Sequence, residues 1–331
     1  MPTYDAEVER WAQELLGASA RVSPLSGGAN NHLFRCRAVN GELVIKRYRD
    51  QNFGADVSRR VAEVTFLRHA AVCAPDFVPK LLAVHDQRDM IAISFVKGDP
   101  YREGADILQP DIEAATRFYR QLNDQDARLL DYPIPARDGY RSISEHLIAV
   151  EQRLAALSVA HLPPDLELPA QSALDEAWRR LESARDTLQR AMASGQLVDP
   201  LPQEYGQLSP GDFGFHNAIW TGHKSVFVDF EYAGLDDPAK TLADFFLQPR
   251  IPVNPRFFDR VAEEMSVNIS APLLKSRARL LGRLLSVKWM AIVLAPLDKV
   301  RFESFALRFG SESSPEIFRR VKLVARRSIF E

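Results

Sequence analysis

The spacing of apolar residues changes once along this chain, and that change constrains the fold more than any other feature. Between residues 20 and 97, short apolar runs such as LVIKRY and MIAISFV alternate with turn-forming glycine, asparagine and proline residues, a pattern typical of β-strands. After Gly98-Asp99-Pro100, apolar residues recur every three or four positions, as in α-helices. We therefore predict an α+β protein with a strand-rich region over 1–97 and a helical region over 98–331.

Individual helices can be placed from the same spacing. One helix is expected within the strand-rich region, because VSRRVAEVTFLRHA places four apolar residues close to one helical face: Val57, Val61, Val64 and Leu67. A second stripe, at the N-terminus, is followed by Gly17 and comprises Val8, Trp11, Ala12, Leu15 and Leu16. Residues 111–126 and 142–158 are also predicted to be helical. A longer charged helix carries the stripe Leu174, Trp178, Leu181, Leu188 and Met192.

The charge balance and the cysteine content argue against several classes of protein. The 331 residues include 42 basic and 44 acidic side chains, so no overall field draws the chain to nucleic acid or to an anionic membrane. Cys36 and Cys73 are too few for a disulfide framework, which suits a reducing cytoplasm. The N-terminus lacks a secretory pattern, and LLSVKWMAIVLAPL is interrupted by Lys288 and ended by Pro296, which favours a buried helix. We expect a cytoplasmic protein that binds neither nucleic acid nor membranes; its oligomeric state stays open.

The segment GDFGFHN (211–217) places a carboxylate and a carboxamide five residues apart, directly before an apolar strand. The next residues, AIWTGHKSVFVDFEYAG, contain two short apolar runs around the turn-like TGHKS, so a hairpin is predicted. If the turn is centred near residue 223, Asn217 and Asp229 lie opposite each other. Two oxygen ligands at one hairpin mouth suit Mg²⁺, which usually takes only one or two protein carboxylates beside phosphate and water. Asp212, on the preceding loop, would be free to face a substrate.

These residues carry a resemblance to a known family. The loop Asp212-x-x-x-x-Asn217, the hairpin and VDFEYAGLDDP together resemble the catalytic centre of the aminoglycoside phosphotransferase and choline kinase group, which has a protein-kinase-like fold. Lys46 resembles the nucleotide-binding lysine on a strand, and Glu63 its helical ion-pair partner. SGGANNHLF is similar to the loop over the phosphates, and IAISFVKG to the strand and hinge between the lobes. The resemblance implies a bilobal fold, with a small antiparallel-sheet nucleotide-binding lobe over 1–97 and a larger helical lobe over 98–331 that carries the catalytic loop and the substrate site.

The resemblance also implies a role for each residue in phosphoryl transfer. Asp212 would orient the acceptor hydroxyl and take its proton, while Asn217 and Asp229 would hold Mg²⁺ against the phosphates. Lys46, fixed by Glu63, would bind phosphate oxygens. The remaining expected nucleotide contacts belong to the glycine-rich loop and to the hinge strand: Gly27, Gly28, Asn30, Asn31, Ser94 and Val96. His216 is expected to pack or hydrogen-bond within its loop rather than to bind a metal.

We therefore predict an ATP-dependent, Mg²⁺-requiring kinase that phosphorylates a hydroxyl of a small molecule, such as a sugar, an amino alcohol or an aminoglycoside-like compound. Two departures from the family pattern leave an alternative open, a nucleotide-binding pseudokinase with a regulatory or assembly role. Pro210 replaces a histidine, and Thr241 in KTLADFF replaces an aspartate, where its hydroxyl could serve as an acceptor at a helix start. A protein kinase is less favoured, because the segment after Asp229 is too short for a long peptide-binding loop.

Two further features have two interpretations each. The acidic run Glu231, Asp236 and Asp237 could attract an amine-bearing substrate, but Asp-Asp-Pro is also common at turns and helix starts. Trp289 could form the wall of a pocket, although packing in the core is favoured.

Overall fold

The computed structural model describes residues 5–25, 31–49, 57–124, 132, 134–298, 301–302, 314–325 and 330. The chain divides into two compact units. The first comprises Met1–Tyr101, Tyr132–Arg137 and Pro210–Gly234, and the second comprises Arg102–Asp131, Asp138–Ser209 and Leu235–Glu331. The predicted lobe boundary between residues 97 and 98 stays a prediction.

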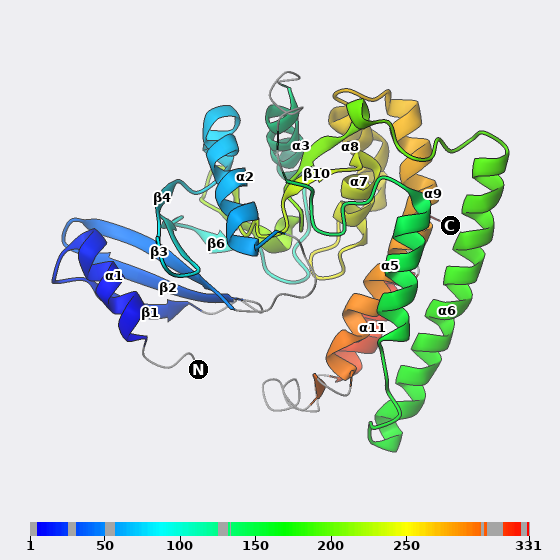
Figure 1. The fold of residues 1–331 in the computed structure, drawn as a ribbon, viewed down its shortest axis with the longest axis horizontal. Helices are drawn as coiled ribbons and strands as arrows, with labels where there is room; N and C mark the ends of the chain where they lie inside the picture. Colours follow the sequence, from blue (N-terminus) through cyan, green and yellow to red (C-terminus); the bar gives the residue numbers. More distant parts are fainter. Residues whose placement is uncertain are drawn as a thin grey trace. The chain divides into compact units, whose positions relative to one another are not determined.

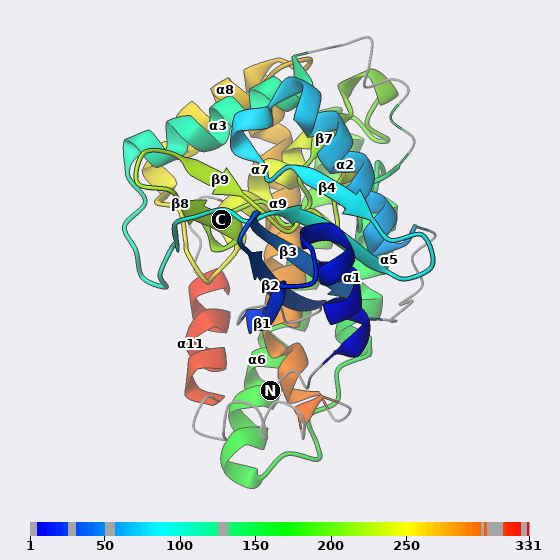
Figure 2. The same ribbon diagram turned by 90° about the vertical axis from the view of Figure 1, so that its left-hand side faces the viewer.

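The first unit is built on an antiparallel sheet of five strands (Figure 2). The strands follow the order β1-β2-β3-β5-β4, with the bounds Arg21–Leu25 (β1), Asn31–Ala38 (β2), Gly41–Tyr48 (β3), Leu81–Val84 (β4) and Met90–Ser94 (β5). Because side chains alternate along a strand, one face of β2 and β3 is buried through Phe34, Cys36, Leu43 and Ile45. This face forms a core with the N-terminal helix.

Helix α1 (Ala6–Leu16) packs on this face through Val8, Trp11 and Ala12 (Figure 1). It begins at Asp5, whose side chain accepts hydrogen bonds from two amides of the first turn. It ends at Gly17, whose φ of 95° favours glycine. The predicted N-terminal helix and its end are confirmed.

Helix α2 (Arg59–Cys73) occurs where the sequence predicts a helix, but its buried face differs from the predicted one. Val61 is 44 % exposed, and Val57 precedes the helix. The buried residues are Ala62, Glu63, Val64, Phe66, Leu67 and Ala70. The prediction was wrong at Val57 and Val61. The helix buries Ala62 and Glu63 instead, and neither residue is a large apolar one that would mark the buried face in the sequence.

The second unit is mostly helical, so the predicted α+β class is confirmed. Its helices are α3 (Gln109–Asn123), α5 (Ile143–Ala155), α6 (Pro164–Ala193), α7 (Pro238–Leu247), α8 (Phe258–Met265), α9 (Ala271–Leu294) and α11 (Ser314–Ala325). The predicted helices at 111–126 and 142–158 correspond to α3 and α5. The predicted stripe lies on α6, where Leu174, Leu181 and Leu188 are buried.

Helix α9 forms the centre of the second unit and contacts α5, α6, α7, α8 and α11 (Figure 1). By length and composition alone, Ala271–Leu297 could cross a membrane, but 61 % of its most apolar stretch is buried inside the protein. This packing is that of a core helix, so the prediction of a buried helix is confirmed.

Charged residues at the start of α7 are buried as ion pairs. Asp236 Oδ2 accepts a hydrogen bond from Lys240 Nζ at 2.6 Å, and Asp237 Oδ2 accepts one from Arg277 Nε at 2.6 Å. Asp237 also caps α7 by accepting from the amide of Ala239 at 2.9 Å. The structure therefore favours the turn and helix-start interpretation for these two aspartates over attraction of a substrate.

Thr241 and Trp289 can also be placed. Thr241 is buried in α7, but the cap of this helix is Asp237, so the predicted role of the Thr241 hydroxyl at the helix start was wrong. Trp289 Nε1 and Lys288 Nζ both donate to Asp244 Oδ1, at 2.7 and 2.8 Å. This contact favours the core interpretation of Trp289.

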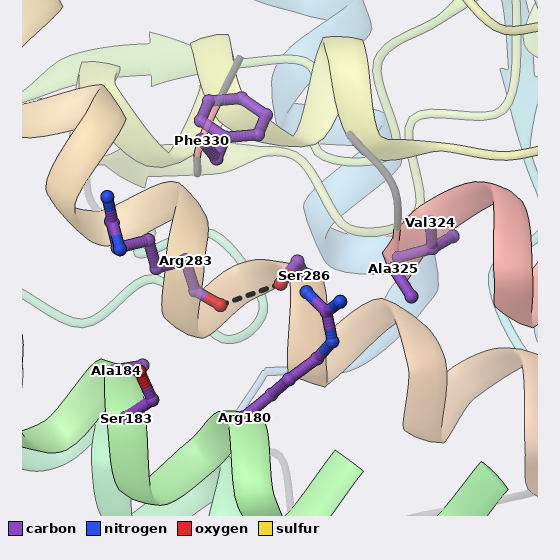
Figure 3. A pocket seen from close by; sticks show the side chains of 8 residues that line it. All are labelled: Arg180, Ser183, Ala184, Arg283, Ser286, Val324, Ala325 and Phe330. Atoms are coloured by element: carbon purple, nitrogen blue, oxygen red, sulfur yellow. Dashed lines mark hydrogen bonds between the residues drawn. The ribbon is translucent and has the colours of Figure 1, made fainter. Parts of the chain in front are cut away.

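A small cavity lies among α6, α9 and C-terminal residues of the second unit (Figure 3). Its polar lining includes Arg180 and Arg283, and its apolar lining includes Phe330. The Ser286 hydroxyl donates to the carbonyl oxygen of Arg283 at 2.7 Å beside it. None of the predicted site residues lines this cavity.

Candidate active site

Lys46 lies at the centre of a buried group of charged residues in the first unit. Its Nζ atom lies 2.5 Å from Glu63 Oε2 and 3.8 Å from Glu231 Oε2, and it also contacts Asp229 Oδ1. Strand β3 carries Lys46, helix α2 carries Glu63, and the segment after β9 (Ser225–Phe227) carries the other two carboxylates. The structure therefore brings together three of the predicted site residues, Lys46, Glu63 and Asp229.

Lys46 stays charged despite its burial. Its side chain is 3 % exposed, and burial alone lowers the pKa of a lysine. The carboxylates of Asp229, Glu63 and Glu231 outweigh this effect and raise the Lys46 pKa. Three carboxylates around one ammonium leave an excess of negative charge, which favours a further cation at this place.

The predicted hairpin is present, but its register differs by one residue. Strands β8 (Ala218–Trp220) and β9 pair antiparallel about a turn centred between residues 222 and 223, earlier than the predicted centre. The carbonyl of Asn217 accepts from the amide of Val228 at 2.9 Å, so Asn217 lies opposite Val228 and not opposite Asp229. The cause is a tight turn with Gly222 in a positive-φ conformation, which favours two central residues.

Asp229 reaches Lys46 because the backbone leaves the strand direction at this residue. Its φ of 68° lies in the left-handed region, which aspartate tolerates better than most residues. Its side chain is 42 % exposed, so the carboxylate contacts Lys46 and is still accessible to a cation.

Asp212 lies on a loop that close backbone contact and aromatic packing hold in place. Gly211 has a φ of 84°, and a Cβ atom there would lie 2.5 Å from the carbonyl carbon of Tyr232, so only glycine fits. The Phe213 ring packs against Phe227, with 5.2 Å between the ring centroids. The glycines and aromatic residues around Asp212 therefore fix its loop against the hairpin and the segment that follows.

The side chain of Asn217 is oriented by Asp212. Its Nδ2 donates to the backbone carbonyl of Asp212 at 2.9 Å and to the carboxylate Oδ2 at 3.2 Å. Because both bonds use the amide nitrogen, the amide oxygen Oδ1 is left for another partner. This oxygen and the accessible Asp229 carboxylate are ligands of the kind that Mg²⁺ takes from proteins, so the donor set fits the ion.

Two of the other predicted nucleotide contacts can be placed in the structure, and three lie outside the described residues. Ser94 ends β5, and its hydroxyl accepts from the amide of Lys80 at 2.9 Å. Val96 lies in the irregular segment after β5. Three of the predicted contacts lie outside the described part of the chain, namely Gly27, Gly28 and Asn30. The roles of all five stay predictions.

Tyr48 and Glu231 are not among the site residues predicted from the sequence, although both contact predicted site residues in the structure. Tyr48 donates its hydroxyl to Glu63 Oε2 at 2.6 Å, and burial raises the Tyr48 pKa. Glu231 is 3 % exposed and accepts from Asn31 Nδ2 at 2.5 Å, so it faces the interior instead of attracting a substrate from solvent. The available signal for Tyr48 is its position two residues after Lys46, on the same face of the strand.

Comparisons with known proteins add independent findings. The sequence model described as "Phosphotransferase enzyme family" matches residues 21–265. No curated protein sequence matches the chain. Among solved structures, a choline/ethanolamine kinase family protein from Mesorhizobium loti has a TM-score of 0.61 at 18 % identity, over 98 % of this chain and 95 % of its own.

Two further solved structures are similar over nearly the whole chain. A spectinomycin phosphotransferase in complex with ADP and spectinomycin has a TM-score of 0.67 at 12 % identity, over 98 % of this chain and 95 % of its own. A choline kinase from Cryptosporidium parvum Iowa II has a TM-score of 0.56 at 12 % identity, over 98 % of each chain. At such low identity these likenesses establish the fold, and the predicted kinase-like fold is confirmed. None of the comparisons supports the pseudokinase alternative.

Proposed function

The chain belongs to the phosphotransferase enzyme family, and we propose that it transfers the γ-phosphoryl group of ATP to a hydroxyl group of a small molecule in a Mg²⁺-dependent reaction. The observation that carries this proposal is the buried Lys46 group. An ammonium held by Glu63 beside the accessible Asp229 carboxylate suits nucleotide phosphates that bind together with a divalent cation. The names of structural neighbours, a spectinomycin phosphotransferase and a choline kinase, support an amino alcohol, a sugar or an aminoglycoside-like acceptor.

In the proposed reaction, the acceptor oxygen forms a bond to the γ-phosphorus while the bond from that phosphorus to the β–γ bridging oxygen breaks. Asp212 accepts the proton of the acceptor hydroxyl, and Lys46 binds phosphate oxygens. Asn217 and Asp229 would hold Mg²⁺, which neutralises phosphate charge when bound. The protein thus positions the reactants and balances their charge.

We also propose a cytoplasmic location for the protein. ATP is available in that compartment, and Cys36 and Cys73 are both free thiols, as expected in a reducing environment.

The test is phosphoryl transfer from Mg²⁺-ATP to a panel of hydroxyl compounds. We expect turnover by the wild type and a loss of roughly 100-fold or more in Asp212→Asn, with ATP affinity retained, because only the base is removed. Lys46→Met should weaken ATP binding, whereas Lys80→Met, which changes an exposed lysine side chain of the same unit, should not. Full turnover in Asp212→Asn would contradict the assigned base. ATP-induced stabilisation without transfer to any compound would favour the pseudokinase.

A further inference from the structure

The carboxylate of Asp212 is held at both of its oxygen atoms. Asn217 Nδ2 donates to Oδ2 at 3.2 Å, and His216 Nε2 lies 3.1 Å from Oδ1. An ionised carboxylate can only accept hydrogen bonds, so in this contact Nε2 would be the donor. Neighbouring residues of one short helical turn, η3 (Phe215–Asn217), thus fix the two ends of one carboxylate.

The burial of His216 indicates that its side chain has a role in addition to packing. Its side chain is 9 % exposed, and its Nδ1 atom is buried with no hydrogen-bond partner among the residues that the structure describes. Burying an imidazole nitrogen without a partner costs free energy that an apolar ring would not cost. The neighbouring residue, Phe215, shows that this turn accommodates such a ring. The contact between Nε2 and Asp212 offsets this cost in free energy and explains why the position holds a histidine.

We propose that His216 is a positioning residue for phosphoryl transfer, and this inference rests on the proposed role of Asp212 as the base. The Nε2 contact restrains the rotamer of Asp212 from the Oδ1 side, as the Asn217 hydrogen bond does from the Oδ2 side. The two contacts hold the carboxylate in one orientation, which we expect to suit the acceptor hydroxyl. His216 acts through Asp212 and itself touches neither the acceptor nor the nucleotide.

The first test compares His216→Leu with His216→Gln, because the glutamine amide can place a donor near the position of Nε2. We expect His216→Leu to lower kcat by about tenfold to a hundredfold while the KM for ATP stays within about twofold, and His216→Gln to keep most of the wild-type kcat. His223→Leu is the matched control, since His223 lies exposed in the turn of the same hairpin. An unchanged kcat in His216→Leu, or an equal loss in the glutamine variant, would overturn the proposal.

The second test separates positioning from a general loss of structure. In an Asp212→Asn background, His216→Leu should lower kcat no further, because a residue that acts through Asp212 has nothing left to position. A loss that multiplies with that of Asp212→Asn would refute the inference. If Asp212→Asn alone kept full turnover, the proposed function itself would fail, which is a distinct result.

A third measurement needs no activity and no variant. Long-range ¹H–¹⁵N NMR of the wild-type histidines should show a proton on Nε2 of His216. A proton on Nδ1 alone would remove the donor from the Asp212 contact and overturn the proposal.

Discussion

Replacement of His146 by phenylalanine should make the stability of the protein less dependent on pH. His146 lies in α5 of the second unit, 2 % exposed, with Nε2 buried and no hydrogen-bond partner to it in the described part of the chain. Burial, together with the nearby charges of Lys240, Lys288 and Arg277, lowers the His146 pKa from 6.5 to about 3. The ring packs edge-on against Tyr140, with centroids 5.2 Å apart, a contact that phenylalanine can keep.

The magnitude follows from the linkage between protonation and folding. Below pH 6.5 the unfolded chain binds a proton at His146 that the folded protein excludes, so this contribution to stability is complete above pH 6.5 and is lost as pH falls towards 3. At about 1.4 kcal/mol per pH unit, the loss is about 2 kcal/mol at pH 5 and about 4 kcal/mol at pH 3, where the folded protein also begins to bind the proton.

The assay is urea denaturation of the wild type and of His146→Phe at pH 7.5 and at pH 5. The wild type should lose about 2 kcal/mol more than the variant over this interval. All other titrating groups are common to both proteins, so the difference isolates His146. His223→Phe, at an exposed histidine, should behave as the wild type does. Equal pH dependence of the wild type and His146→Phe would refute the reasoning.

Two substitutions test the Asp212 loop and the proposed metal ligand Asp229. Gly211→Ala should destabilise the protein by about 2–3 kcal/mol in urea denaturation, because the new Cβ would meet the backbone of Tyr232. Gly222→Ala is the control: Gly222 also has a positive φ but no atom within 4 Å of the added Cβ, so this change should cost only about 1 kcal/mol. Equal losses of stability in the two variants would exclude the close contact as the cause. Asp229→Ala should weaken Mg²⁺-dependent ATP binding at least about tenfold more than Asp212→Ala does in a titration with nucleotide, because the first removes a ligand and the second a base. Equal nucleotide affinity in the two variants would contradict the assignment of Asp229.

Part of the site could be predicted because its residues are recognisable one at a time. The buried pairing of Lys46 with Glu63 followed from a resemblance, since a lysine in an apolar strand and a glutamate in a helix give no pairing signal by themselves. The hairpin was predictable from its two apolar runs, but its register was not. The letters TGHKS fit turns with two or three central residues, and the choice between them moves Asp229 by one position.

Other features of the structure depend on contacts that no local pattern contains. Asp237 is buried because Arg277, forty positions later in the chain, pairs with it at 2.6 Å. Ala62 and Glu63 lie on the buried face of α2, although neither is a large apolar residue. In each case, tertiary contacts decide the burial of a residue whose own side chain does not favour it.

The first unit consists of three separate segments of the chain, and this has a consequence for protein engineering. A gene truncated after Tyr101 would encode Lys46 and Glu63 but would omit Pro210–Gly234, and with it Asp229 and Glu231. The fragment would therefore keep one of the three carboxylates that surround the lysine ammonium. To express the first unit alone, a designer would have to join the later stretches to it through artificial linkers.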